Sequence, residues 1–333
     1  MRIDSDDRKT QPQGLVESYW RSVRQDLFGT PLLLRELARD RASALAPPVF
    51  RRSIDEGDMP QWDLLAKRAG GWPHRAAGEI RMWRYDRSGE RSEKVIVEAF
   101  KHLITESKST MTVDIRDIEC LVFSKTDLYK FATLDEMATT ACPDWIKNVS
   151  REQLHALLAK APPASTEGWL SLVAWDDRLT LIAYDGSHHF AAARYLAGQL
   201  NEPVPMTMEL TKRSINAQAL DELEQSYDAF VLLDRPDFNH ALTEAFKAAS
   251  VPHGRKELRL SRALGDRNYQ LILLPRESKR AMRSAAVLHA AGALTLPRLL
   301  RIQQLQANDH LSISEVFQGQ DPDDHAPGVR WQA

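Results

Sequence analysis

Cysteine is scarce in this chain, whose 333 residues include only Cys120 and Cys142. Two thiols without Cys-x-x-Cys spacing are too few for a disulfide scaffold, so the sequence predicts a protein of a reducing compartment. Long apolar runs are lacking as well, because no segment approaches the roughly 20 apolar residues of a membrane helix and the first residues lack the apolar core of a signal peptide. We therefore expect no membrane partner and a soluble protein of the bacterial cytoplasm.

A strong net charge is also absent, because 44 basic residues face 46 acidic ones and the formal net charge is −2. A chain balanced in this way has no overall electrostatic attraction to nucleic acid or to a membrane surface. Any contact with nucleic acid would have to come from a local patch. We find no internal repeat and no low-complexity tract, and the length suffices for two domains or one elaborated domain with a sizeable core.

The segment from Leu179 to Leu196 contains the densest group of chemically capable residues. Its first six residues are strand formers, Asp185-Gly186 forms a turn, and an alanine-rich helix follows that we expect to end at Gly198. A strand that enters a helix through a glycine turn places the free backbone N–H groups of the first helical turn at the end of the sheet. Such groups bind anions, and phosphate is the usual ligand.

Four residues at this turn have a functional and a structural interpretation each. Gly186 permits a positive φ or a close backbone approach to a ligand, or simply makes a tight turn. Ser187 suits a helix N-cap, and as a nucleophile it would need His188 or His189 as its base. The two histidines can donate to a phosphate or act as acid and base near neutral pH, or one can pack while the other is solvated.

Asp185 and Arg194 complete the set of candidate site residues. Asp185 could hold a metal ion that bridges phosphates, or cap the turn, and Arg194 could reach back to a phosphate or form a surface salt bridge. An Asp-x-x-His-His metal site would need a distant further ligand, for which we considered His74, His102 and Glu98. We predict no metal site from this pattern.

The periodicity of apolar residues predicts alternating helices and strands, and hence a mixed α/β fold. Helices are expected over residues 15–27, 32–45, 150–160, 187–198, 214–227, 238–250, 277–291 and 297–307. Strands are expected over residues 79–86, 93–100, 169–175, 179–184, 204–210, 229–234 and 269–274, and the first half of residues 112–123 alternates like a strand. Ser150 and Gln153 match a capping pattern. Residues 1–13 and 319–333 read as disordered.

The stretch Asp185-Gly-Ser-His-His-Phe-Ala-Ala-Ala-Arg194, with the strands and helix around it, resembles the ParB/sulfiredoxin superfamily over about residues 112–212. The resemblance implies a ParB/sulfiredoxin-like core over residues 76–212. An N-terminal helical region with a disordered start, residues 1–75, would precede it. A C-terminal α/β and helical extension, residues 213–318, would follow it, before the tail of residues 319–333.

The resemblance further implies nucleotide-phosphate binding at the start of the alanine-rich helix. The ligand would be a nucleotide, ATP or CTP with magnesium, or a phosphorylated small molecule. The binding residues would be Gly186, Ser187, His188 and Arg194, and His188, His189 and Asp185 would serve phosphoryl transfer or phosphoester hydrolysis. Two positions depart from the superfamily, because Ser187 replaces the reactive cysteine of sulfiredoxins and His189 replaces an arginine.

Two alternatives remain open at this level. Basic residues gather between Arg255 and Arg301, which favours a non-catalytic DNA- or RNA-associated factor, although a solvated face with offsetting acids has the same pattern. The loss of the arginine at His189 equally fits an interaction protein that keeps the fold without the chemistry.

Overall fold

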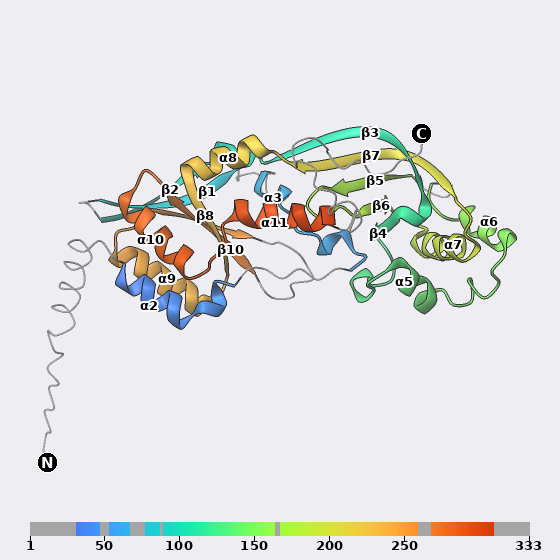
Figure 1. Ribbon diagram of the computed structural model, residues 1–333, viewed down its shortest axis with the longest axis horizontal. Helices are drawn as coiled ribbons and strands as arrows, with labels where there is room; N and C mark the ends of the chain where they lie inside the picture. Colours follow the sequence, from blue (N-terminus) through green and yellow to red (C-terminus); the bar gives the residue numbers. More distant parts are fainter. Residues whose placement is uncertain are drawn as a thin grey trace, which may run out of the picture.

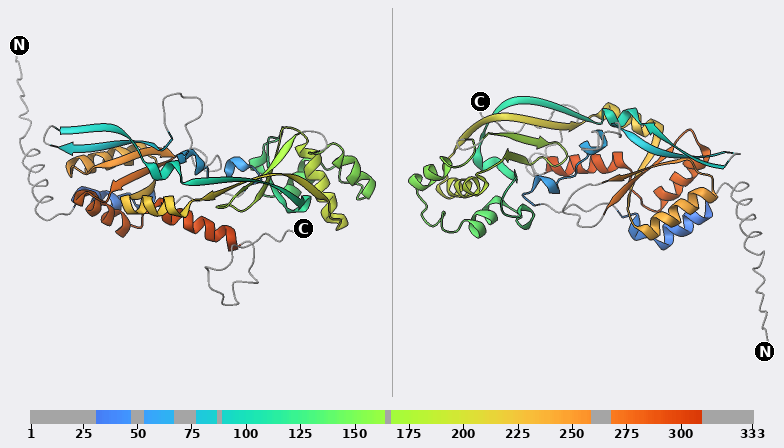
Figure 2. Two further views of the ribbon diagram at one scale, coloured as in Figure 1. Left: turned by 90° about the horizontal axis from the view of Figure 1, so that it is seen from above. Right: turned by 180° about the vertical axis from the view of Figure 1, so that it is seen from behind.

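The computed structural model describes residues 31–46, 53–66, 77–86, 89–163, 167–258 and 268–309. The expected helix over residues 15–27, the disordered start and the tail of residues 319–333 lie outside these ranges. The mixed α/β fold predicted from the sequence is confirmed, because helices pack on two five-stranded sheets that lie one after the other along the long axis (Figures 1 and 2). Among the described residues, no helix combines the length and the apolar character needed to cross a membrane.

One sheet, which we call the β10 sheet, is antiparallel throughout. Its strands lie in the order β2 (Gly89–Ile96), β1 (Glu79–Asp86), β9 (His253–Leu258), β10 (Tyr269–Pro275) and β8 (Tyr227–Leu233). Both faces are covered by helices, as the alternation along β10 shows. Ile272 and Leu274 pack in one hydrophobic cluster, and Leu271 and Leu273 pack in another.

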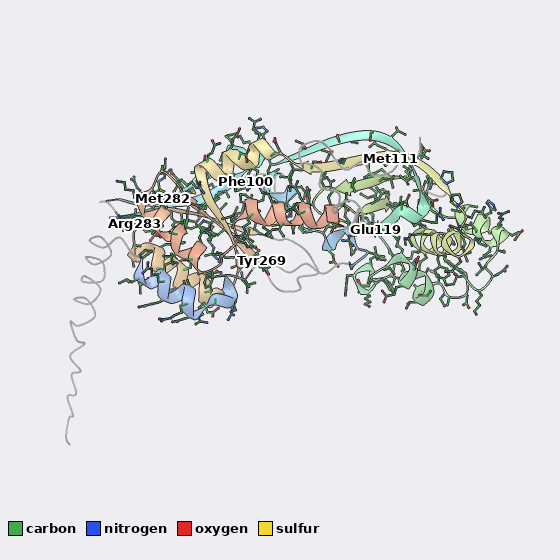
Figure 3. The ribbon with its side chains drawn as sticks, viewed as in Figure 1. Phe100, Met111, Glu119, Tyr269, Met282 and Arg283 are labelled. Carbon is green, nitrogen blue, oxygen red and sulfur yellow. The ribbon has the colours of Figure 1, made fainter. Side chains whose placement is uncertain are left out.

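The helices on the two faces come from distant parts of the chain. The Ile272 face is covered by α2 (Leu32–Asp40), α9 (Pro236–Ala248) and α10 (Lys279–Ala290), and the Leu271 face by α8 (Ala217–Ser226) and α11 (Leu296–Asp309) (Figure 1). Phe100 and Tyr269 belong to the Leu271 cluster and lie in the left half of the molecule in Figure 3.

The other sheet, which we call the β6 sheet, mixes parallel and antiparallel pairs. Its order is β3 (Ile104–Asp114), β7 (Pro205–Ile215), β5 (Gly168–Val173), β6 (Leu179–Ala183) and β4 (Ile118–Val122). The pairs β5–β7 and β4–β6 are parallel, and the pairs β3–β7 and β5–β6 are antiparallel. This arrangement places β4 at one edge, beside β6.

Three helices, α5 (Leu134–Ala141), α6 (Arg151–Leu158) and α7 (Ser187–Leu200), share the hydrophobic core of the β6 sheet. The alanines at 191–193 in α7 are all fully buried in this core. Small side chains let a helix backbone approach its neighbours closely, so this stretch serves packing. The Ser150 cap is formed as expected, since its side chain accepts a hydrogen bond from the Gln153 backbone N–H at 3.2 Å.

The strand pairing differs from the expected division at residues 76 and 212. The β1–β2 hairpin was expected within the core, but Met82 of β1 pairs with Gly254 of β9, so the hairpin belongs to the β10 sheet. Gly254 permits this approach, because a Cβ atom there would lie 2.5 Å from the Met82 sulfur. β9 itself was not predicted, because its polar sequence lacks a clear alternation of apolar residues.

The described residues before 75 also do not form a region of their own. Helix α2 packs on α9 and α10 of the β10 sheet. Residues 53–66 contact the cores of both sheets. Asp55 forms a β-bridge with Leu121 of the β6 sheet. The Trp62 indole donates to the Gln303 side chain of α11, beside the β10 sheet, at 2.7 Å. The tertiary structure therefore interleaves segments that the sequence suggested were consecutive.

Several element boundaries also differ from those expected. Residues 112–123 are divided by a 3-10 turn, Ile115–Asp117, between β3 and β4. Its start is fixed by Asp114, whose carboxylate accepts from the Arg116 N–H at 2.9 Å. Helix α7 ends at Leu200 instead of Gly198, with Asn201 in the left-handed conformation, and α2 ends at Asp40.

Candidate functional site

The loops that follow β4 and β6 form a pocket of about 440 Å³, lined by residues 123–125 and 184–189 together with Trp145. Because β4 and β6 are parallel neighbours, their carboxyl ends meet at the same edge of the sheet. Ligands of sheets with parallel strands commonly bind outside these carboxyl ends. The pocket is thus lined by the predicted turn and by a second loop, residues 123–125, which the sequence alone did not connect with that turn.

Helix α7 begins at this pocket with Gly186 as its N-cap residue, at φ +80°. The Asp185 carboxylate accepts a hydrogen bond from the Gly186 N–H at 2.8 Å, which fixes the turn. No side chain caps the helix, and its first turn contains no acidic residue. The N-terminus of α7 therefore presents backbone donors and the positive end of its dipole, and the carboxylate beside it, that of Asp185, is bound to the Gly186 N–H.

Ser187 is not the N-cap residue that we expected, because it is the first residue of the helix itself. Its hydroxyl group lies 3.1 Å from the Ser124 hydroxyl oxygen, and only 8% of the residue is exposed. The contact ties the start of α7 to the loop after β4. It also shows that the Ser187 hydroxyl is engaged with another hydroxyl and not with a histidine base.

The two histidines occupy different surroundings in the pocket. The Nε2 atom of His188 lies 2.8 Å from the Thr126 hydroxyl oxygen. The ring of His189 stacks on Trp145, with ring centroids 4.3 Å apart and planes 20° apart. Burial lowers the pKa of both histidines, with a further decrease from Lys125 for His188 and from Lys160 for His189. Both rings are therefore mostly neutral at pH 7, able to donate from one nitrogen and accept at the other.

Arg194 is not among the residues that line the pocket, and its contacts match the salt-bridge alternative that the sequence left open. Its guanidinium donates to two backbone carbonyl groups, that of Ile118 at 2.8 Å and that of Arg116 at 2.9 Å, and it pairs with the Asp135 carboxylate at 2.5 Å. Three partners in fixed directions occupy the planar fork of an arginine. Arg194 therefore holds the start of β4 and helix α5 against α7 and is removed from the set of phosphate ligands.

Metal-ligating groups are not assembled around the turn. Within the described ranges, no three His, Cys, Asp or Glu side chains are grouped to hold a metal ion. Of the distant ligands considered, Glu98 and His102 lie in and just after α4 (Glu98–Lys101), which packs with α8 beside the β10 sheet, and His74 lies outside the described residues. The Asp-x-x-His-His interpretation thus has no support from the structure.

The sequence did not indicate five residues that line the pocket, nor Thr126, which contacts His188. These six residues lie in three places: the loop after β4, the segment after α5 and the position after β6. They are Phe123, Ser124, Lys125, Thr126, Trp145 and Tyr184. Their one local signal is a Ser-Lys pair directly after the apolar run that ends at Phe123. That signal gains meaning only when β4 is known to lie beside β6.

Three arginines of the predicted basic region pair with acidic residues in the part of the chain that the structure describes. Arg255 pairs with Asp234 at 3.4 Å, Arg276 with Asp228 at 2.8 Å, and Arg301 with Glu224 at 2.6 Å. These pairs match the pattern of a solvated face with offsetting acids. Binding of nucleic acid through this region stays a prediction.

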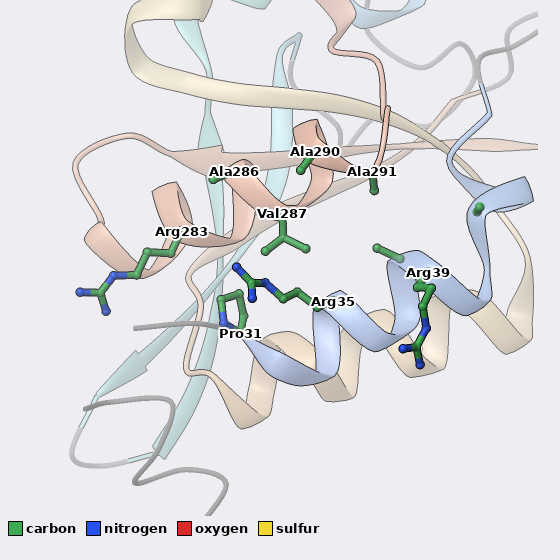
Figure 4. Close-up of a pocket in the computed structure, with 10 residues that line it drawn as sticks. Pro31, Arg35, Arg39, Arg283, Ala286, Val287, Ala290 and Ala291 are labelled. Carbon is green, nitrogen blue, oxygen red and sulfur yellow. The ribbon is translucent and has the colours of Figure 1, made fainter. Parts of the chain in front are cut away.

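A second hollow, of about 550 Å³, lies between α2 and α10, with Arg35, Arg39 and Arg283 around it (Figure 4). Its other lining residues are alanines, Val287 and Pro31, so it contains no group suited to acid–base or nucleophilic chemistry. The pocket at α7 remains the better candidate, because it combines a helix N-terminus, a lysine and two histidines.

The structure thus defines a mixed α/β protein with a polar pocket where two parallel strands end. Residues 108–312 match a family of unknown function, DUF6685, and the chain belongs to that family. The match extends from β3 to α11 and includes the whole pocket. Searches of curated proteins and of solved structures found no match.

Proposed function

We propose that this protein binds the phosphate group of a nucleotide or of another phosphoester in the pocket at the start of α7. The observation that carries the proposal is an uncapped N-terminus of a 14-residue helix, without an acidic first turn, that opens into a pocket containing Lys125. Backbone N–H groups, the helix dipole and an ammonium group favour the same negatively charged ligand. The resemblance of this turn to the ParB/sulfiredoxin superfamily supports the same ligand class.

The chemistry that suits the pocket is phosphoryl transfer or phosphoester hydrolysis. A neutral His188 or His189 can accept a proton from an attacking hydroxyl or water, because burial lowers the pKa of both rings. The N–H groups at the start of α7 would stabilise charge on the phosphate oxygens as it develops. Magnesium, where required, would be bound mainly through phosphate oxygens and water, as is common for this ion.

Binding can be tested by calorimetry and thermal unfolding with inorganic phosphate, pyrophosphate, ATP, CTP and GTP, each with and without magnesium. We expect stabilisation of about 2.7 kcal/mol at a ligand concentration of 100 Kd. Lys125→Ala and His188→Ala should weaken binding about tenfold, since a charge-assisted hydrogen bond contributes on this scale. Suitable controls are Lys108→Ala on β3 and His240→Ala on α9, two exposed residues outside the pocket.

The proposal fails if none of these ligands changes the unfolding temperature or gives heat of binding. It also fails if Lys108→Ala weakens binding as much as Lys125→Ala, because a general charge effect would then explain the affinity. Turnover of a bound nucleotide, followed by release of inorganic phosphate, separates an enzyme from a binding protein.

A further inference from the structure

Two large aromatic side chains lie exposed on the rim of the α7 pocket. Phe123 is 53% exposed and Tyr184 is 67% exposed, and their rings stack with centroids 5.3 Å apart and planes 18° apart. Trp169 meets Tyr184 edge to face at 6.4 Å. Exposing apolar area costs about 25 cal/mol per Å², so packing within this chain does not account for two such rings in water.

The position of the pair relates it to the pocket. Phe123 directly follows β4 and Tyr184 directly follows β6, so the parallel pairing of these strands brings the rings together. Both residues line the pocket that also contains Lys125 and the first turn of α7. One site therefore combines a flat aromatic surface with groups that attract an anion.

A ligand that satisfies both features has a flat ring system and a phosphate group in one molecule. Bases stack on aromatic side chains with little preference for sequence, because every base has a π face. The pocket volume of about 440 Å³ lies within the range of small-molecule sites. A nucleotide fits this description, as a free molecule or as part of a single strand.

The adjoining hollow decides between these two sources. It has a volume of about 760 Å³, shares residues 123–125 with the pocket, and is also lined by Asp55, Glu56, Asp127 and Lys130. Lys130 pairs with the Asp127 carboxylate at 3.4 Å. A continuing phosphodiester backbone would meet the carboxylates of Asp55 and Glu56, whereas the hydroxyl groups of a sugar can donate to them. The lining of this hollow therefore favours a free nucleotide over a nucleotide that continues into a strand.

We infer that the ligand of this pocket is a free mononucleotide whose base stacks on the Phe123–Tyr184 pair while its phosphate faces Lys125 and the start of α7. The inference rests on the proposed function and adds the aromatic part of the ligand to it. Stacking contributes to the affinity for all four bases, and the phosphate contribution is common to every ligand.

The test compares the four ribonucleoside monophosphates with ribose 5-phosphate by calorimetry on the full chain. We expect the nucleotides to bind about tenfold more tightly than the sugar phosphate, which is the order of affinity that a stacked base provides. Phe123→Gly and Tyr184→Ala should reduce the affinity for the nucleotides to about that for ribose 5-phosphate. Glycine suits position 123, where φ is +63°, so this variant removes the ring without straining the backbone.

The controls separate the aromatic pair from the phosphate site. Tyr129→Ala removes another exposed aromatic residue that lines neither hollow, and it should keep the preference for nucleotides. Lys125→Ala should weaken every phosphate ligand by a similar factor. Tyr184→Trp retains a stacking surface and should retain the preference, which distinguishes stacking from a role of Tyr184 in folding.

Three outcomes would overturn the inference. Equal affinity for ribose 5-phosphate and the nucleotides would exclude a base site and leave the proposed phosphate binding intact. No binding of any phosphate ligand would remove the proposed function as well. A short single-stranded oligonucleotide that binds more tightly than the mononucleotides, with a steep dependence on salt, would replace the free nucleotide by a nucleic acid strand.

Discussion

His253 illustrates how the fold sets the properties of a single residue. Only 3% of it is exposed, and its ring stacks on Trp83 at 5.2 Å and contacts Phe246 at 4.6 Å. Burial lowers its pKa from 6.5 to about 4, with a smaller decrease from Arg255, although the hydrogen bond to the Val251 carbonyl group opposes the shift. The folded chain therefore keeps this imidazole neutral at pH values where the unfolded chain protonates it.

The neutral ring predicts a loss of stability in acid. The pKa of His253 is lower in the folded chain than in the unfolded chain. The contribution of this residue to the free energy of unfolding is therefore fully present above pH 6.5 and is lost progressively as pH falls to about 4. We expect a decrease of about 3 kcal/mol in the free energy of unfolding from this group. Urea unfolding at pH 7, 5.5 and 4.5 should show that the free energy of unfolding falls less with decreasing pH for His253→Phe than for the unchanged chain. The exposed His240→Ala should retain the full decrease, and identical slopes for all three chains would contradict the assignment.

At the scale of the element, the start of α7 depends on a backbone conformation that favours glycine. Gly186 adopts φ +80°, which directs the chain from β6 into the helix and opens its first turn toward the pocket. An L-residue in this left-handed region costs roughly 1–2 kcal/mol. Gly198 lies near the other end of the same helix with no positive φ, and a Cβ atom added there would meet no atom within 4 Å.

Replacing each of the two glycines by alanine should change the free energy of unfolding in opposite directions. Gly186→Ala is expected to lower the free energy of unfolding by about 1–2 kcal/mol, because the new Cβ strains the turn. Gly198→Ala is expected to raise it by about 0.5–1 kcal/mol, because alanine loses less conformational entropy in a helix. Urea unfolding of both variants measures the difference. A shift of the same sign in both would show that the turn tolerates a side chain.

On the scale of the whole molecule, the core of the β10 sheet joins segments that are distant in the sequence, namely residues 53–66 and α11. Trp62 is fully buried, and its indole N–H donates to the carbonyl oxygen of the Gln303 side chain at 2.7 Å. The two residues are 241 positions apart. Removing either partner leaves a buried polar group unpaired, which costs about 1–3 kcal/mol.

A double-mutant cycle can measure this connection. Trp62→Phe and Gln303→Leu should each lower the free energy of unfolding, and the double variant should lose about 1–2 kcal/mol less than the sum of the two, because it leaves no unpaired group. The exposed Thr112–Thr207 hydroxyl pair on β3 and β7 offers a comparison, with a coupling of only a few tenths of a kcal/mol. Additive effects at Trp62 and Gln303 would show that the hydrogen bond does not couple residues 53–66 to α11.

The sequence predicted the elements whose signals are local. The Ser150 cap, the strand beginning at Leu179 and the start of α7 follow from residues within one or two turns. Helix α5 was missed although its signal is present, since Thr133 and Glu136 form a capping pattern in which the Thr133 hydroxyl accepts from the Glu136 N–H at 3.0 Å. β9 had no such signal, because it becomes a strand through pairing with β1 and β10 on its two sides.

The candidate site also has features that follow from local sequence and features that depend on the tertiary structure. The turn at Asp185-Gly186 and the two histidines could be identified from sequence, because φ preference, helix starts and titration are properties of individual residues. The direction of Arg194 could not, since the carbonyl groups of Arg116 and Ile118 that bind it become available only when β4 lies beside β6.

The sequence by itself determined that a helix begins after a glycine turn in a mixed α/β chain, because those preferences act within a few residues. Only the tertiary structure decided what faces that helix. Thr126 and His188 are 62 positions apart, yet their side chains meet at 2.8 Å because β4 and β6 pair in parallel. The same pairing brings Phe123 and Lys125 to the pocket. Strand pairing depends on how the whole core packs, so no short segment of the sequence specifies it.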